Sequence, residues 1–313
     1  MNLQQFRYVR ETVRQGLNLT EAAHVLYTSQ PGISKQIKEL ENELGVEIFA
    51  RRGKRFVALT DAGKALMKVI ERLLLEAENL KRVAREFSDR ESGSLVIATT
   101  HTQARYALPR AIQAFRARCP NVRLALKQGS PTQIAEFVLR DEADLAIATE
   151  TLDSYPELLA LPSYHWRHCA IVPEAHPLAG VARLSVEELA RYPIVTYSPE
   201  FAGRAHIDAA FRAKGLTLQP VLSALDADVI KTYVELGLGV GIIAAMAFDA
   251  ARDRGLRALD ASHLIQSNTT RVAVRRGAYL RSFVYDFLEL FSPQLSRELI
   301  EKAAVGEGIM YEL

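Results

Sequence analysis

The chain has 313 residues, more than one ordinary hydrophobic core can use, and this length fits two or three domains. The formal net charge of +2 excludes a uniformly basic surface, so any affinity for nucleic acid has to come from a local patch. Cys119 and Cys169 lie far apart and outside any CxxC pattern, which argues against a disulfide framework and fits a reducing compartment. The first residues lack the apolar run of a signal peptide, and no segment has the roughly 20 apolar residues of a membrane span. We therefore expect a cytoplasmic protein without membrane contact.

The first 59 residues are predicted to form a small helical unit. An apolar stripe over residues 6–13 predicts one helix, and Leu19–Leu26 predicts a second, short amphipathic helix. The stretch Thr28–Glu41 then predicts a turn and a third helix, because Pro31 suits a first helical turn. Two short helices joined by a tight turn are the pattern of a helix-turn-helix, whose second helix enters the major groove of DNA.

The third helix has two different faces. One face, which we expect to be buried, carries apolar residues at helical spacing, namely Ile33, Ile37, Leu40 and Leu44. The turn and the other face carry side chains that can cap the helix or contact phosphates and base edges: Thr28, Ser29, Gln30, Pro31, Ser34, Lys35 and Lys38. The alternative interpretation is an ordinary helical hairpin with a polar, solvent-exposed face.

A basic hairpin is predicted next. The segment Ala50–Leu59 places cations on both sides of Gly53 between short apolar runs. Its side chains Arg51, Arg52 and Lys54 would lie along the phosphate backbone, as the wing of a winged helix-turn-helix, and would make binding salt-dependent. The alternative for this segment by itself is a solvated basic loop.

Residues 60–92 are expected to form a linker and dimerisation helix. Thr60 or Asp61 can cap its start, and Ser88–Gly93 is typical of a linker. Its apolar residues alternate gaps of three and four, as in a heptad seam: Leu66, Ile70, Leu73, Ala77, Leu80, Ala84 and Phe87. We expect this stripe to pair with its copy in a second subunit, since DNA half-sites are read by two copies. The alternative is packing within the same chain.

Residues 93–313 change to alternating strands and helices. Apolar strands from Leu95 onward follow a β-α-β-α-β pattern, which predicts a parallel sheet with right-handed crossovers. A second such unit begins near Trp166, and the last strand and helix are placed back on the first sheet. We therefore expect an α+β multidomain protein whose C-terminal part has two α/β lobes with a small-molecule cleft between them, lobe I (about 93–164 and 266–292) and lobe II (about 165–265).

The turn after the first of these strands is the candidate ligand site. Thr99–Gln103 links a strand to a helix, so its free backbone N–H groups favour an anion, and its hydroxyls and amide add uncharged donors. The alternative is plain N-capping by threonine. The glycines of Gly237–Gly241 follow a helix instead of a strand, so we interpret them as a tight turn and not as a dinucleotide site. The histidines lack spaced partner ligands and no nucleophile–base pair is evident, so we expect no metal, no cofactor and no catalysis.

These motifs together resemble the LysR-type transcriptional regulators. The matching positions of the N-terminal unit are Ala22-Ala23, Thr28–Pro31, Ser34, Leu40-Glu41, Leu44-Gly45, Phe49–Arg51, Leu59-Thr60 and Gly63. Four longer stretches are similar to the sulfur-assimilation regulators of that family, namely Leu26–Gly32, Ala98–Tyr106, Gln128–Gln133 and Asp226–Tyr233. The resemblance covers essentially the whole chain.

The resemblance implies a homotetramer, a dimer of dimers, that binds promoter DNA and works with RNA polymerase. It would act mainly as an activator of genes for sulfate assimilation and cysteine biosynthesis. Its inducer would be N-acetylserine, formed from O-acetylserine, and sulfate or thiosulfate could occupy the cleft. The effector-site positions that the resemblance implies are Thr100, Thr102, Gln103, Ser130, Thr149, Trp166 and Ala202.

One of these positions departs from the family pattern. Ala202 stands where well-known members carry threonine, and a lost hydroxyl hydrogen bond is worth roughly 0.5–1.5 kcal/mol, so the ligand preference stays open. Related regulators of sulfonate and alkanesulfonate use share most of the motifs, which makes that set of genes the alternative. Two other classes are a two-lobed solute-binding protein and an enzyme. The absence of a signal peptide and of a nucleophile–base pair argues against them.

Overall fold

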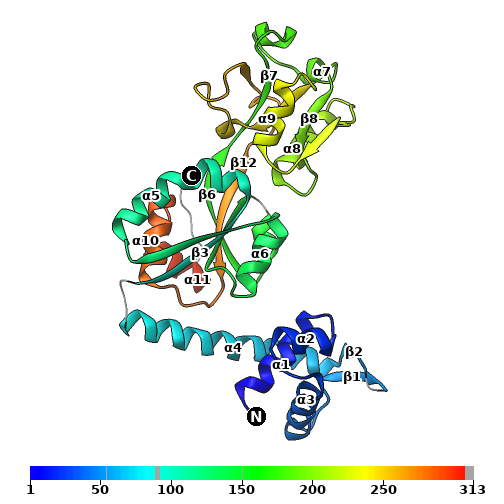
Figure 1. The fold of residues 1–313 in the computed structure, drawn as a ribbon, viewed down its shortest axis with the longest axis vertical. Helices are drawn as coiled ribbons and strands as arrows, with labels where there is room; N and C mark the ends of the chain where they lie inside the picture. The colour runs from blue at the N-terminus through cyan, green and yellow to red at the C-terminus, as the bar shows by residue number, and fades with distance from the viewer. Residues whose placement is uncertain (54, 89–91, 150, 307–313) are drawn as a thin grey trace. The chain divides into compact units, whose positions relative to one another are not determined.

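The computed structural model describes residues 1–53, 55–88, 92–149 and 151–306, without the side chain of Ala202. The chain divides into two compact units, Met1–Phe87 and Ser88–Leu313, and each is described by itself (Figure 1). Lys54 and the side chain of Ala202, both predicted as site residues, lie outside the described residues, as do residues 89–91 of the predicted linker.

The first unit is helical with a two-stranded wing. Its elements are α1 (Leu3–Arg14), α2 (Leu19–Val25), α3 (Gln30–Leu44), β1 (Phe49–Arg52), β2 (Arg55–Leu59) and α4 (Asp61–Ser88). Side-chain caps from Asn2, Asn18 and Ser29 begin α1, α2 and α3, and the Thr60 hydroxyl accepts a hydrogen bond from the Gly63 N–H at the start of α4. The helix-turn-helix and the antiparallel hairpin are thus confirmed as elements.

The core of this unit explains two of its sequence features. The apolar face of α3 is fully buried, as predicted, at Ile33, Ile37 and Leu40. Phe49 and Phe56 stack across the hairpin with ring centroids 4.4 Å apart. A Cβ at Gly63 would lie 2.1 Å from the carbonyl oxygen of Ile48, so only glycine lets α4 approach the chain before the hairpin this closely.

The apolar seam predicted along α4 divides into two parts. Near the start of the helix, Leu66 and Ile70 pack into the core of their own unit. Farther along, Leu73, Leu80 and Phe87 are 41%, 73% and 86% exposed. The first part therefore matches packing within the chain, whereas the second part presents an apolar stripe on the surface of this unit.

Lobe I of the second unit is built on a five-stranded sheet with the order β4-β3-β5-β12-β6. Its elements are β3 (Gly93–Thr99), α5 (Leu108–Arg118), β4 (Val122–Gln128), α6 (Pro131–Leu139), β5 (Leu145–Thr149), β6 (Leu158–Trp166), β12 (Asn268–Arg275), α10 (Ser282–Phe291) and α11 (Arg297–Ala304). The strands β4, β3 and β5 are parallel, and β12 is antiparallel to β5 and β6. Helices α5 and α10 cover one face and α6 covers the other (Figure 1). Successive side chains of β3 point to opposite faces of the sheet and therefore enter two different cores.

Lobe II is built on a second five-stranded sheet with the order β11-β7-β10-β8-β9. Its elements are β7 (His168–Pro173), α7 (Val186–Leu189), β8 (Ile194–Tyr197), α8 (Ala202–Arg212), β9 (Leu222–Ala224), α9 (Ala227–Glu235), β10 (Val240–Ala244) and β11 (Leu256–Asp260). Four short helices complete the second unit. The π-helix η1 (Gln103–Ala107) and the 3-10 helix η2 (Thr151–Ser154) lie in lobe I, and the 3-10 helices η3 (Pro177–Gly180) and η4 (Ala245–Ala247) lie in lobe II. The chain crosses between the lobes after β6 and again before β12, so the expected two-lobed arrangement is confirmed.

Several elements go beyond the sequence prediction. The pattern predicts lobe I only to about residue 292, whereas α11 follows and buries Ile300 and Ala303 in the lobe I core. Strand β6 pairs along its whole length with β12, and no local sequence pattern indicates this long-range pairing. Gly237 has a φ of 79° between α9 and β10, which agrees with the predicted tight turn. Among the described helices, none is long and apolar enough to cross a membrane.

Candidate functional site

Seven of the residues predicted to contact DNA lie in the turn before α3 and along that helix. The Ser29 hydroxyl accepts a hydrogen bond from the Gly32 N–H at 3.3 Å and so caps the helix. Lys35 lies 3.9 Å from Glu39, an exposed pair that contributes little to stability. Two of these residues, Gln30 and Ser34, are partly buried, whereas five are exposed: Thr28, Ser29, Pro31, Lys35 and Lys38.

The turn that leads into α3 holds a strained residue. Tyr27 has a φ of 51° and is 98% exposed. The Tyr27 N–H donates to the His24 carbonyl at 3.2 Å, and the Thr28 N–H donates to the Ala23 carbonyl at 3.0 Å. This is a Schellman ending of α2, in which glycine is the usual residue at the left-handed position. Tyrosine there costs backbone strain that its exposed ring cannot recover by packing.

One cation of the basic hairpin is engaged inside its own unit. Glu41 is only 6% exposed, and its carboxylate accepts hydrogen bonds from the backbone N–H groups of Ile48 (2.8 Å) and Phe49 (3.1 Å). Its other oxygen forms an ion pair with Arg51. Arg51 therefore fastens the hairpin to α3, whereas Arg52 is exposed near the hairpin tip. The predicted phosphate contact of Arg51 has to compete with this internal role.

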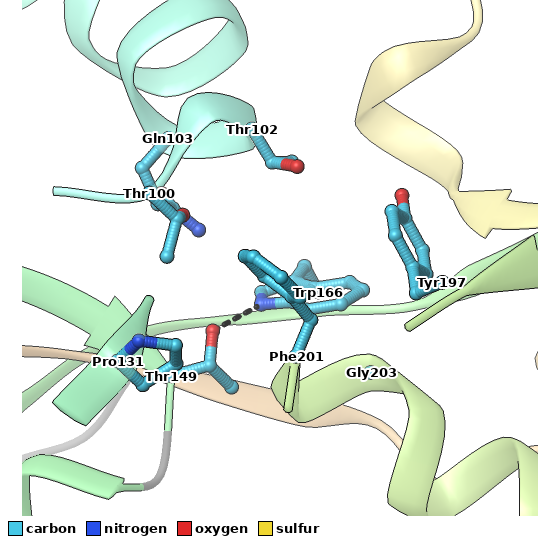
Figure 2. A pocket seen from close by; sticks show the side chains of 9 residues that line it. All are labelled: Thr100, Thr102, Gln103, Pro131, Thr149, Trp166, Tyr197, Phe201 and Gly203. Carbon is cyan, nitrogen blue, oxygen red and sulfur yellow. Dashed lines mark hydrogen bonds between the residues drawn. The ribbon is translucent and has the colours of Figure 1, made fainter. Parts of the chain in front are cut away.

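A small cavity lies between the two lobes, at the carboxyl ends of β3 and β5 (Figure 2). Its volume is about 30 Å³, and one water needs roughly 10–15 Å³, so the cavity has room for about two waters. Five of the seven predicted effector residues line it, all from lobe I: Thr100, Thr102, Gln103, Thr149 and Trp166. The structure therefore brings together residues that are far apart in the sequence.

The cavity offers uncharged hydrogen-bond donors. Its lining residues carry no formal charge. The Ala104 N–H makes a helical bond to the Thr100 carbonyl at 3.0 Å, so the N–H groups of the residues between them precede the first helical bond. Together with the threonine hydroxyls, these N–H groups can hold a carboxylate or a tetrahedral oxyanion reversibly.

Two neighbours in lobe I fix the amide of Gln103. The Tyr164 hydroxyl donates to Oε1 of Gln103, and Nε2 of Gln103 donates to the Thr270 hydroxyl at 3.1 Å. Burial raises the pKa of Tyr164, although its contacts with Thr270 and Gln103 oppose the shift, so the phenol stays a donor at neutral pH. Gln103 is itself 1% exposed, and its remaining amide hydrogen is the group available to a ligand.

The indole of Trp166 forms another wall and is held from behind. Its Nε1 donates to the Thr149 hydroxyl at 3.4 Å, and its ring lies 5.0 Å from that of His168. Burial, aided by a smaller effect of a neighbouring histidine, lowers the pKa of His168 to about 3, so this ring is neutral. A Cβ at Gly203 would lie 2.7 Å from Nε2 of His168, so the start of α8 can approach this wall only with glycine.

The structure places one predicted effector residue outside the lining. Ser130 forms a capping box with Gln133 at the start of α6, and Pro131 beside it reaches the cavity instead. The sequence reasoning missed this residue and all of the lobe II lining, which is Tyr197, Phe201 and Gly203. A partial signal was the Phe201–Arg204 stretch, which departs from the family pattern next to Ala202. The Tyr197 hydroxyl accepts the Ala244 N–H at 3.0 Å, which fixes its ring at the wall.

In the described part of the chain, one group of side chains has the chemistry of metal ligands. Ligand atoms of His101, Asp226 and Asp228 lie within 4.8 Å of one another. Asp228 is already paired with Arg105 at 2.8 Å, and the ammonium of Lys231 lies 3.3 Å away. These two positive charges disfavour a cation at the same carboxylate.

Two family profiles match the chain over both units. The bacterial regulatory helix-turn-helix protein of the lysR family matches residues 3–64, and the LysR substrate binding domain matches residues 88–296. The chain belongs to the LysR family of transcriptional regulators. This LysR regulator is therefore a DNA-binding protein with a winged helix-turn-helix and a two-lobed α/β domain.

Curated relatives narrow its place in the family. The regulator is 60% identical over 296 residues to the HTH-type transcriptional regulator SsuR of Burkholderia cenocepacia, covering 95% of this chain and 96% of that protein. It is 58% identical over 313 residues to the HTH-type transcriptional regulator CysB of the same organism, covering 100% of both. The crystal structure of the cofactor-binding domain of the Cbl transcriptional regulator aligns with a TM-score of 0.67 at 46% identity, covering 69% of this chain and 94% of that chain. Because these relatives are transcriptional regulators, the solute-binding and enzyme alternatives are set aside.

Proposed function

We propose that this LysR regulator activates genes for sulfate assimilation and cysteine biosynthesis when a small effector binds between its lobes. The observation that carries the proposal is the convergence of Thr100, Thr102, Gln103, Thr149 and Trp166 on one uncharged cavity. We infer that the inducer is N-acetylserine, derived from O-acetylserine, and that sulfate or thiosulfate competes for the same donors. A carboxylate and a tetrahedral oxyanion suit the same backbone and hydroxyl groups.

Control of genes for sulfonate and alkanesulfonate use is the second candidate. Two relatives with different regulator names, SsuR and CysB, match the chain at 60% and 58% identity, so overall similarity supports each set of genes about equally. Ala202 belongs to the stretch beside Phe201 and Gly203, which line the cavity, so this position is where we expect the two effector preferences to separate.

We further propose how the regulator reaches DNA. Helix α3 would enter the major groove, with Gln30 and Ser34 at base edges and Arg52 and Lys54 on the phosphates. The exposed part of the α4 seam, at Leu80 and Phe87, would pair two subunits. Two such dimers would form a tetramer through the effector domains and work with RNA polymerase at promoters in the cytoplasm.

The DNA-binding part of the proposal is tested by gel shifts on promoters of sulfate-assimilation and sulfonate-use genes at several salt concentrations. We expect affinity to fall steeply with salt. Gln30→Ala should relax sequence preference, whereas Arg52→Ala should weaken binding to every sequence and reduce the salt slope by about 1. Binding that is absent or insensitive to salt would contradict this proposal.

The effector part is tested by calorimetric titration with N-acetylserine, O-acetylserine, sulfate, thiosulfate and adenylyl sulfate. We expect N-acetylserine or one of the sulfur oxyanions to bind, and Thr100→Ala to weaken it. Ser130→Ala is the matched control, because that hydroxyl caps α6 outside the cavity lining. Unchanged binding by the Thr100 variant would show that the cavity is assigned wrongly.

A further inference from the structure

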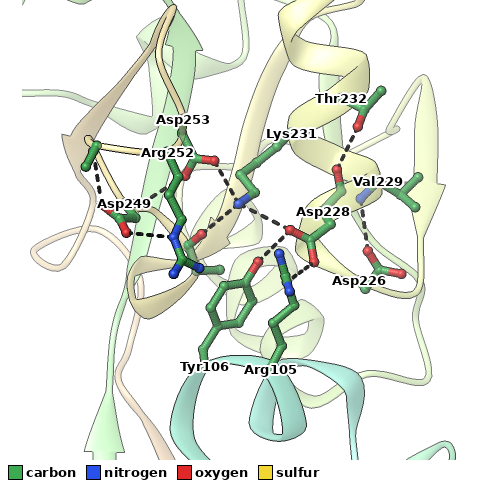
Figure 3. A network of polar contacts seen from close by, with 12 residues as sticks. Arg105, Tyr106, Asp226, Asp228, Val229, Lys231, Thr232, Asp249, Arg252 and Asp253 are labelled. Atoms are coloured by element: carbon green, nitrogen blue, oxygen red, sulfur yellow. Dashed lines mark hydrogen bonds and ion pairs between the residues drawn. The ribbon is translucent and has the colours of Figure 1, made fainter. Parts of the chain in front are cut away.

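One short element takes part both in the cavity and in the contact between the lobes. The π-helix η1 begins with Gln103, which is buried in the cavity wall, and continues with Arg105 and Tyr106. These two side chains leave lobe I and reach helix α9 of lobe II (Figure 3). A π-helical turn is wider than an α-helical one and is frequent at functional sites, and here it lets neighbouring side chains point to different structures.

Both side chains contact the carboxylate of Asp228 on α9. The Tyr106 hydroxyl donates to Oδ1 of Asp228 at 2.7 Å, and Nε of Arg105 pairs with Oδ2 at 2.8 Å, so both carboxylate oxygens are used (Figure 3). Lys231 lies 3.3 Å from Oδ1 and is itself anchored to Asp253 at 3.0 Å. We call Arg105, Tyr106, Asp228 and Lys231 the lobe latch.

The surroundings keep the latch groups in the protonation states that these bonds need. The ring of Tyr106 packs against the core of lobe II, below the ammonium of Lys231 at 5.5 Å. Burial raises the pKa of Tyr106, so its hydroxyl remains a donor. Partial burial would raise the pKa of Asp228, but the Tyr106 hydrogen bond and the charges of Lys231 and Arg105 prevail and lower it. The carboxylate therefore stays ionised at neutral pH.

The latch matters for the cavity because both lobes supply its walls. Thr100, Gln103 and Thr149 belong to lobe I, and Tyr197 and Gly203 belong to lobe II. Any rotation of one lobe against the other separates these walls. A ligand that needs both walls binds more tightly when the lobes are already held together, since less ordering is left for the binding step.

We propose that the lobe latch pre-organises the effector cavity and that Asp228 is a positioning residue for effector binding, although it does not line the cavity. The proposal rests on the proposed function of the cavity. It deepens that function, because it assigns the affinity for effector partly to an ionic contact outside the binding site. Loss of the latch lets the lobe II wall move away from Gln103, which Tyr164 and Thr270 hold in lobe I.

The test uses the full-length protein with sulfate and N-acetylserine as probes. Trp166 is the only tryptophan of the chain and lines the cavity, so its fluorescence reports binding directly. We expect Tyr106→Phe and Asp228→Asn each to weaken binding of whichever probes bind by about 5–10-fold, as loss of one hydrogen bond or ion pair does. The double variant should weaken binding by less than the product of the two single effects, because both substitutions act on the same latch. The control Asp260→Asn removes a lobe II carboxylate that pairs with Ser262, and it should leave affinity unchanged.

A second measurement decides the proposal even without an effector. In the ligand-free protein, acrylamide should quench Trp166 more strongly in both latch variants than in the wild type and in Asp260→Asn. Wild-type affinity in the latch variants, or effects of the two substitutions that simply multiply, would overturn the latch and leave the effector site standing. If the wild type binds neither probe, the proposed effectors are wrong, and unchanged quenching then overturns the latch independently.

Discussion

The proposed DNA-contact face and the effector cavity are built in opposite ways. The face lies on one capped helix, its residues are neighbours in the sequence, and most of them are exposed. The cavity draws on separate segments of both lobes, and its polar side chains are mostly buried, with Gln103 and Trp166 hydrogen-bonded to neighbouring side chains. Water can replace a hydrogen-bond partner that is lost from the exposed face, whereas a buried side chain that loses its partner keeps the full desolvation cost. Substitutions on the face should therefore have small and independent effects on stability. Substitutions around the cavity should also disturb neighbouring side chains.

Glu41 is the sharpest test of this comparison. It lies on α3, the helix of the exposed face, but its own side chain is buried and hydrogen-bonded. Glu41→Ala leaves the N–H groups of Ile48 and Phe49 and the charge of Arg51 without their partner. We expect unfolding free energy to fall by about 3–5 kcal/mol in denaturant titrations. Glu39→Ala, on the exposed face of the same helix, should change it by less than about 0.5 kcal/mol. Equal effects of the two substitutions would contradict the comparison.

His168 makes stability depend on pH. Its folded pKa of about 3 lies below its ordinary value of 6.5, so the unfolded chain takes up the proton first. The stabilisation is fully present above pH 6.5 and is lost as pH falls, by about 2 kcal/mol between pH 7 and pH 5. Thermal unfolding at both pH values should show this loss, and His168→Gln should reduce it.

Tyr164 lies behind the cavity wall and tests whether effects spread to the ligand. Tyr164→Phe removes the donor that orients the Gln103 amide. We expect effector affinity to fall about tenfold, near 1.4 kcal/mol, with DNA affinity in the absence of effector unchanged. Tyr285→Phe, which removes a phenol elsewhere in lobe I, should bind the effector as the wild type does. Fluorescence titration of Trp166 measures the effector affinity of both variants.

Tyr27 should give the smallest effect and one of opposite sign. Tyr27→Gly relieves a left-handed backbone conformation, and we expect unfolding free energy to rise by about 1 kcal/mol. Thr28→Gly, at a neighbouring position with ordinary backbone angles, should lower it instead. A loss of stability in the Tyr27 variant would mean that its side chain makes contacts that its exposure does not suggest.

The sequence by itself determined the elements whose signals are local. Helical spacing placed the buried face of α3, the cations around Gly53 placed the hairpin, and alternating apolar runs placed the first parallel strands. The resemblance to the family named five residues that line the cavity, and three of them, Thr100, Thr102 and Gln103, lie in a quoted motif. The residues that contact DNA and the residues that contact the effector remain predictions.

Tertiary structure alone decided what depends on segments that are far apart. It showed that Arg51 forms an ion pair with Glu41. It also showed that Tyr197 and Gly203 line the cavity, whereas Ser130 caps α6 outside the lining. It also placed Tyr106 against Asp228, a pairing between lobes that no local pattern indicates. The physical reason is that caps and amphipathic faces depend on residues within a few positions of one another. A cavity wall or an ion pair between lobes depends on packing that only the complete fold establishes.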